Sequence, residues 1–200
     1  MVAGDAGVRR LTAADPARAQ AAVGSLRMNL HWSLAAAPQA PRQRPEFDVD
    51  LGALYQLSDG RCGVVQYLGG LRGAFDRAPF LHLDTDDRAG SAVGENLFLN
   101  LDRADSWQRV LVFVYAHHGP LARARIGVDF HPSAGAGSFR IGLDPIPADA
   151  HACAVALITS AGGQVTVRRE ARFVPGYQQD LDRVYGFGLR WGRADKPGLR

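Results

Sequence analysis

Hydrophobic and polar residues alternate one by one along much of this chain, and this period of two is typical of strands with one buried face. Residues 26–32 form the first such segment, and residues 47–57 form the second, with Asp48 and Asp50 on its polar face. The same reasoning predicts further strands over residues 61–68, 80–83, 97–101, 109–116, 126–130, 139–143, 152–158 and 164–174. Two of them, 109–116 and 152–158, are continuously apolar, so we expect both of their faces to be buried.

Turn signals and the scarcity of helical patterns set the expected fold class. Ser58-Asp59-Gly60 predicts a tight hairpin, because Asp-Gly tolerates the positive φ of such turns. About ten short strands, with only a helical turn expected at 178–184, predict an all-β fold: a β-sandwich of two mainly antiparallel sheets with a few short helical segments.

The expected domain occupies residues 26–192. Residues 1–25 are expected to form a weakly ordered or helical N-terminal arm, with a short helix over 13–23 whose apolar stripe is only alanine. Residues 193–200 are expected to be a C-terminal tail. A length of 200 residues suits a single all-β domain.

Composition narrows the function classes. The formal charge is +3, and nearly all the positive charge is arginine scattered along the chain, so we expect no nucleic-acid partner. Cys62 and Cys153 lack metal-ligand spacing and are expected to be free thiols in a reducing compartment. The N-terminus shows no signal-peptide pattern, and no apolar run approaches the roughly 20 residues of a spanning helix. The predicted location is cytoplasmic.

Candidate chemistry concentrates in residues 84–96, which hold four carboxylates and two glycines in an otherwise basic chain. Crowded like charges repel, and hard oxygen ligands of this kind suit Ca²⁺ first and Mg²⁺ second. The segment is not an EF-hand, because Arg88 occupies the fifth loop position and Ala89 stands where glycine is required. The remaining ligands must therefore come from elsewhere, and the Asp48–Asp50 pair is the obvious source.

We expect one or two calcium ions at this place, with side-chain oxygens and the Gly90 carbonyl as ligands. The candidate metal ligands are Asp48, Asp50, Asp84, Asp86, Asp87, Gly90, Glu95 and Asn96. The alternative is an ordinary solvated loop, in which Asp86 and Asp87 form exposed ion pairs with Arg88 or Arg72 that contribute little energy.

Three segments together resemble the TerD-domain proteins, the tellurium-resistance and general stress family of bacteria. Residues 47–55 resemble that family's first acidic strand, 86–90 resemble its Gly-Asp-Asn-x-Thr-Gly box, and 94–96 fall where it has Asp-Asp-Glu. The ending, residues 177–191, is most similar to the TerA-type branch.

The resemblance implies a β-sandwich with a calcium pair between acidic loops, roles in stress resistance, and no established catalysis. It carries ligand roles to Asp48, Asp50, Asp86, Asp87, Glu95 and Asn96, whereas Asp84 is added from the charge pattern alone. Two departures, Ala89 for the threonine and Gly94 for an acid, indicate one ion instead of two, or weaker binding.

Three functions remain open from the sequence. The first is a non-enzymatic calcium-binding stress protein whose partners are other stress-response or Ter-type proteins, including at the inner membrane surface. The second is a divalent-metal-dependent transferase or hydrolase that uses the Asp-x-Asp pair, and the third is an interaction module with an acidic contact loop. Other polar groups predict structural roles: His117-His118 a turn or cap, and Asp180 with Asp182 a cap or an ion pair with Arg183.

Overall fold

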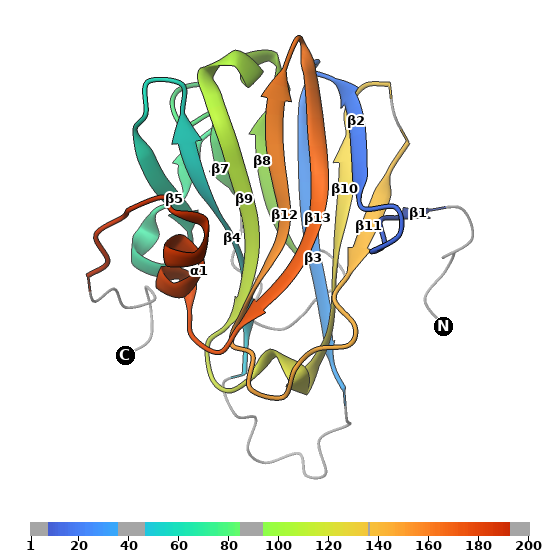
Figure 1. The fold of residues 1–200 in the computed structure, drawn as a ribbon, viewed down its shortest axis with the longest axis vertical. Coiled ribbons are helices and arrows are strands. Elements are labelled where there is room, and N and C mark those ends of the chain that lie inside the picture. The colour runs from blue at the N-terminus through green and yellow to red at the C-terminus, as the bar shows by residue number, and fades with distance from the viewer. Residues whose placement is uncertain (1–7, 36–46, 85–93, 136, 193–200) are drawn as a thin grey trace.

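Two β-sheets pack face to face in the computed structural model, which describes residues 8–35, 47–84, 94–135 and 137–192 (Figure 1). The seven-stranded sheet contains, in spatial order, β1 (Arg9–Arg10), β11 (Phe139–Gly142), β10 (Ala124–Pro132), β3 (Ser25–Leu34), β8 (Glu95–Asn100), β7 (Leu81–Leu83) and β6 (Gly73–Ala74). The six-stranded sheet contains β2 (Ala17–Ala21), β13 (Gln164–Val174), β12 (Ala152–Ala161), β9 (Trp107–Ala116), β4 (Val49–Leu57) and β5 (Cys62–Gln66).

The strand pairs are antiparallel apart from β1 with β11, so the predicted all-β sandwich is confirmed. Short 3-10 helices span Leu68–Gly70, Leu101–Ser106 and Leu121–Arg123, and an α-helix, α1, spans Gln178–Tyr185 where a helical turn was expected. No helix within the described ranges is long and apolar enough to cross a membrane.

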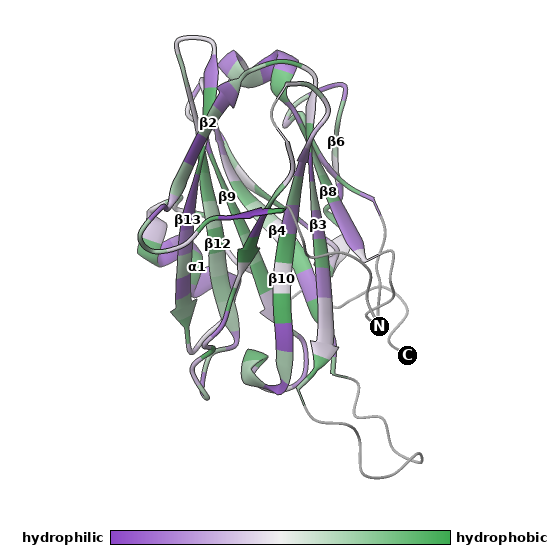
Figure 2. Cartoon of the chain, turned by 90° about the vertical axis from the view of Figure 1, so that its right-hand side faces the viewer, coloured by the Kyte–Doolittle hydropathy of each residue, from purple (hydrophilic) through white to green (hydrophobic). Residues whose placement is uncertain are grey.

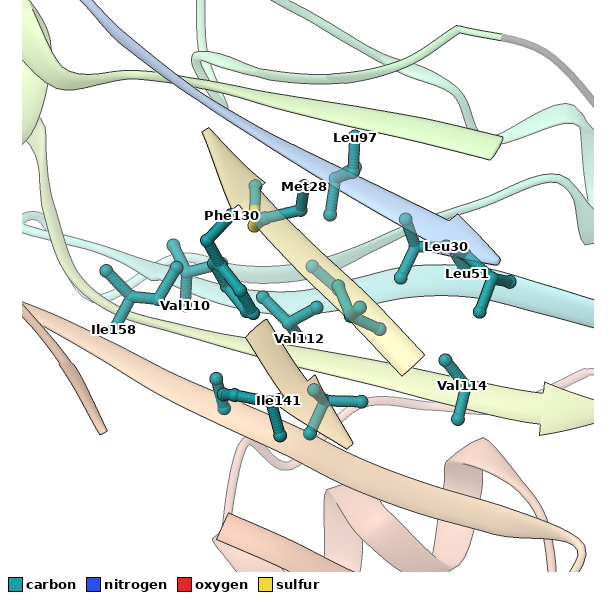
Figure 3. Close-up of a cluster of buried hydrophobic side chains, with 14 of the residues drawn as sticks. Met28, Leu30, Leu51, Leu97, Val110, Val112, Val114, Phe130, Ile141 and Ile158 are labelled. Carbon is teal, nitrogen blue, oxygen red and sulfur yellow. The ribbon is translucent and has the colours of Figure 1, made fainter. Parts of the chain in front are cut away.

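The main core lies between the two sheets, which the side view in Figure 2 shows as two layers. Alternating residues of facing strands fill it, as the period-two pattern predicted (Figure 3). Its buried side chains include Met28, Leu30, Leu51, Leu97, Val110, Val112, Val114, Phe130, Ile141 and Ile158. Full burial of one such side chain contributes about 1.5–3 kcal/mol, so this layer is the principal source of stability.

A second hydrophobic cluster covers the outer face of the six-stranded sheet. Leu54, Leu111 and Phe113 of that sheet pack against Leu181 of α1 and Phe187 of the segment after it. In Figure 1, α1 lies in front of the sheet beside β4, β5 and β9. Residues 109–116 are continuously apolar because β9 has one face in each cluster, which confirms the expected burial on both faces.

The predicted helix over residues 13–23 is wrong. Residues 17–21 form β2, which pairs antiparallel with residues 164–168 of β13, and β1 pairs with β11. Leu11 is buried in the main core, so this part of the chain is integral to the sandwich. The alanines favour a helix locally, but the edge of β13 offers backbone hydrogen bonds that an isolated helix with a weak apolar stripe cannot match.

The hairpin and the two thiols agree with their predictions. Gly60 adopts φ +87° between β4 and β5, which is the left-handed conformation expected of the Asp-Gly turn. Cys62 is half-buried and Cys153 is buried, and both are free thiols. Burial raises the pKa of both, so neither thiol is activated as a nucleophile.

Candidate metal site

The starts of β4 and β8 come together at one edge of the sandwich, although they belong to different sheets. The backbone N–H of Leu51 donates a 2.7 Å hydrogen bond to Oε2 of Glu95. Beside it, the N–H of Asp84 donates to the Asn96 carbonyl at 2.9 Å. The ends of the acidic segment therefore lie next to the strand that carries Asp48 and Asp50.

Asp48 and Asp50 lie on the face of β4 opposite the main core, since Val49 and Leu51 point into that core. Asp50 pairs across the sheet with Tyr115 of β9, and the N–H of His117 donates to the Asp48 carbonyl at 2.9 Å. All three carboxylates are buried: Asp48 is 6%, Asp50 0% and Glu95 1% exposed. The alternative of a fully solvated acidic surface does not describe these three residues.

Tyr115 is affected by all three carboxylates. Burial, followed by the charge of Asp50 and a side-chain hydrogen bond with it, and then by the charges of Glu95 and Asp48, raises the pKa of its hydroxyl far above the usual range. The charges of all three acids reach this phenol, so each of them lies in the neighbourhood of the end of β9. Buried like charges lose hydration and repel one another, and a bound cation offsets both costs.

The structure does not bring the Asn96 side chain to this location. Neighbouring residues on a strand point to opposite faces, so Asn96 and Glu95 diverge. The Oδ1 of Asn96 instead accepts hydrogen bonds from Asn29 at 2.9 Å and from Arg27 at 3.3 Å. A cationic guanidinium beside this amide makes it a poor ligand for Ca²⁺.

Gly94 has a steric reason to be glycine. Its φ is +61°, and a Cβ placed there would overlap the carbonyl oxygen of Leu30 on β3. An acidic side chain, which the family resemblance would put here, does not fit between these strands. The site therefore has one carboxylate fewer than the resemblance implies.

The structure describes only one of the four remaining candidate ligands. Asp84 is half-buried directly after β7, whereas Asp86, Asp87 and Gly90 lie outside the described residues. Within the described ranges, no three His, Cys, Asp or Glu side chains are positioned to hold an ion together. The donor set at this edge is nonetheless all oxygen, which fits Ca²⁺, and a complete shell would need oxygens from residues 85–93.

Comparison with known proteins finds similarity both in sequence and in structure. The chain is 28% identical over 188 residues to the tellurium resistance protein TerA of an Alcaligenes species, covering 86% of this chain and 53% of that protein. A crystal structure of a homologue of the telluride resistance protein TerD from Streptomyces coelicolor A3(2) superposes with a TM-score of 0.58 and 26% identity. That match covers 79% of this chain and 94% of the solved one.

These matches support a Ter/TerD-type family for the chain. No protein-family model matches it. The chain spans about half the length of its curated relative TerA. The resemblance predicted from the acidic strand, the box and the ending is thus confirmed at the level of a Ter/TerD-type protein.

The polar groups of the C-terminal segment have structural roles, as predicted. Asp180 accepts from the Tyr177 N–H at 3.1 Å and pairs with Arg183 at 2.6 Å, so it caps α1. Asp182 accepts from the N–H groups of Gly188 and Leu189 and from the indole of Trp191, and so holds the last described residues against the sheet.

Sequence reasoning missed Tyr115 as a member of the acidic site. The residue stands in a continuous apolar strand, where a tyrosine resembles any other core aromatic. Only the register between β4 and β9 places it opposite Asp50. The separation of Asn96 from Glu95, by contrast, follows from their adjacency on a predicted strand.

Proposed function

We propose that this protein is a non-enzymatic, calcium-binding stress protein of tellurium-resistance type, with the ion held by Asp48, Asp50 and Glu95 and by oxygens of residues 84–93. One observation carries the proposal: Asp50 of β4 and Glu95 of β8 are both buried, and the Glu95 contact with the Leu51 N–H lies at the edge where the acidic segment begins and ends. Ca²⁺ accepts six to eight oxygens, so it suits a site that combines buried carboxylates with a carbonyl-rich segment.

The chain's own residues would link the ion to the fold. Glu95 fixes β8 to β4 through the Leu51 N–H, and Asp50 lies on β4 one residue before that contact. Bound calcium would supply positive charge beside these acids. The expected result is a more rigid edge between the two sheets.

We propose one ion, the smaller of the two numbers expected from the sequence. Gly94 contributes no carboxylate, and the Asn96 amide is turned toward Arg27 and Asn29. Both departures remove ligands on the β8 side of the site. The proposal also includes a cytoplasmic location and Ter-type protein partners, which the free thiols and the similarity to TerA support.

Thermal unfolding with and without calcium tests this function. A ligand that binds only the folded state at 100 times its Kd adds about 2.7 kcal/mol of stability. For a domain of this size, that corresponds to a rise in Tm of roughly 5–10 °C over the EDTA-treated protein. Magnesium at the same concentration should give a smaller rise, because Mg²⁺ requires a stricter octahedral shell. An unchanged Tm in calcium would contradict the proposal.

A metal-dependent transferase or hydrolase remains the competing function for the Asp-x-Asp pair. Such enzymes generally bind nucleotides on an α/β sheet, whereas the described residues form an all-β sandwich with one short α-helix. Turnover of a nucleotide sugar or a phosphoester with Mn²⁺, lost in Asp50→Asn, would establish the enzyme and overturn the non-enzymatic part of the proposal.

A further inference from the structure

A pocket of about 580 Å³ lies between the six-stranded sheet and the C-terminal segment. Its lining includes Tyr115 and His117 at the end of β9, Gln66 of β5, Gln178 of α1, and Trp191. Small-molecule sites in proteins occupy roughly 300–1,000 Å³ and combine aromatic walls with a few fixed polar groups. This pocket has the size and the composition of such a site.

The polar groups of the pocket are held in place. Gln178 and Gln66 are both buried, and the amide Nε2 of Gln178 donates to the Oε1 of Gln66 at 3.3 Å. The indole N–H of Trp191 donates to Asp182 at 2.7 Å, which orients its ring at the pocket wall. A ligand would therefore meet a preformed site, which lowers the entropic cost of binding.

One buried polar atom in the pocket lining, Nε2 of His117, has no hydrogen-bond partner among the described residues. Buried polar atoms are nearly always satisfied, so this nitrogen calls for a partner supplied from outside the described residues. A ligand that can both donate and accept a hydrogen bond would satisfy this nitrogen in either tautomer of the imidazole. Tyr115 also lines the pocket; it is itself buried, and its hydroxyl is within range of the charges of Asp50, Glu95 and Asp48.

The charge of the lining narrows the class of ligand. No Asp, Glu, Lys or Arg of the described ranges lines the pocket. An anion would also lie near Asp48, Asp50 and Glu95, whose charges reach Tyr115. The lining instead offers partly exposed aromatic faces of Tyr177 and Trp191, and the amides of the two glutamines.

We propose that this pocket binds an uncharged small molecule with a flat ring and an amide-like edge that both donates and accepts hydrogen bonds. The ring stacks on Trp191 or Tyr177, and the edge reaches Gln66, Gln178 and His117. This site is separate from the calcium proposal, although Tyr115 borders both. Ring stacking on a protein aromatic contributes enough to bring even a small fragment into the millimolar range.

Three isosteric probes test the class of ligand: benzamide is neutral, benzoate is an anion and benzamidine is a cation. In ¹H–¹⁵N NMR spectra of the full chain, benzamide should shift the side-chain signals of Gln66, Gln178 and Trp191 with a millimolar Kd. Benzoate should leave them unchanged, and benzamidine should bind no more tightly than benzamide. The Kd of benzamide should be equal in calcium and in EDTA. The result therefore does not depend on whether the proposed calcium site exists.

Substitutions of lining residues test whether benzamide binds in this pocket. Trp191→Ala should raise the benzamide Kd about tenfold, and Tyr177→Ala, whose exposed ring supports no core packing, should also raise it. Val184→Ala, an exposed position of α1 outside the lining, is the matched control and should leave the Kd unchanged. The proposal is overturned if benzamide shifts none of the three signals, if either charged probe binds more tightly, or if both aromatic variants keep the wild-type Kd.

Discussion

The carboxylate of Glu95 accepts a hydrogen bond from the backbone N–H of Leu51, and this contact joins a strand of one sheet to a strand of the other. Both groups are buried, so the bond forms in a medium of low polarity where it is strong. The same carboxylate contributes to the raised pKa of Tyr115. Glu95 thus has two separable roles, as a backbone acceptor and as a negative charge.

Substitutions of Glu95 separate these roles. Glu95→Ala leaves the buried Leu51 N–H without its acceptor and should lower the free energy of unfolding by about 2–3 kcal/mol. Glu95→Gln keeps an oxygen acceptor and should cost less, while it removes the charge and reduces the stabilisation by calcium. Urea unfolding in calcium and in EDTA measures both effects. Equal losses for the two variants would show that the hydrogen bond is not the source of the stability.

The effect of Asp50→Asn on the free energy of unfolding should change sign when calcium is bound. In EDTA the variant should be more stable than wild type by about 1 kcal/mol, because one of three buried carboxylates is gone. In saturating calcium the order should reverse, because a ligand is lost. Asp105→Asn, at an exposed position away from the site, is the control. A variant less stable in EDTA and still stabilised by calcium would argue against a charge cluster.

Gly94→Ala should destabilise the protein more than Gly60→Ala does. Both glycines have positive φ, so both substitutions cost about 1 kcal/mol in backbone strain. A Cβ at position 94 would also overlap the Leu30 carbonyl, whereas position 60 has open space. The expected difference in the free energy of unfolding is about 1–3 kcal/mol. Equal losses of unfolding free energy for the two variants would mean that β3 and β8 can move apart to accept the Cβ without destabilising the fold.

Asp129, on the outer face of the seven-stranded sheet, makes a pH-dependent contribution to the stability of the fold. Burial opposes ionisation, but the Arg140 guanidinium, bound at 2.6 and 2.8 Å, and the nearby His31 hold the pKa of this carboxyl below its usual range. A lowered pKa gives stability above the unfolded value of about 3.9, and this stability is lost as the pH falls through the folded value.

Asp129→Asn should therefore lose about 1–2 kcal/mol at pH 7, and this loss should shrink from about pH 4 downward. Urea unfolding of both proteins at a series of pH values tests it. Asp76→Asn, at an exposed position, is the control. A gap between wild type and Asp129→Asn that is constant from pH 7 to about pH 2.5 would refute the ion-pair explanation.

Asp182→Asn should loosen the segment after α1. The carboxylate accepts hydrogen bonds from the N–H groups of Gly188 and Leu189 and from the indole of Trp191, and an amide can replace only part of this set. The expected cost is about 2 kcal/mol, with faster amide hydrogen exchange in residues 187–191. Exchange rates in β3, which does not contact the segment, serve as the reference. Unchanged exchange in residues 187–191 would show that Phe187 packing alone holds the segment.

The strands could be predicted from the sequence wherever one face is buried. Leu26, Met28 and Leu30 alternate with polar neighbours, so a strand with one buried face places all three in the core. β3 has this arrangement. β2 could not be predicted, because its partner is β13, near the other end of the chain, and its own alanines carry no pattern of burial.

The candidate metal site, too, could be predicted from the sequence only in part. The shared face of Asp48 and Asp50 follows from their spacing, whereas the arrival of Glu95 beside them depends on how two sheets pack. Tyr115 depends on the register of β4 against β9, which no local pattern encodes. The predictions for Asp86, Asp87 and Gly90 stay predictions, since these positions lie outside the described residues.

Native mass spectrometry of wild type and Asp50→Asn, each in calcium and after EDTA, tests the central claim most directly because it counts ions on the folded chain. The account predicts one calcium ion on wild type, its loss in EDTA, and no ion on Asp50→Asn. A wild-type protein without calcium, or a variant that keeps the same ion, would contradict it.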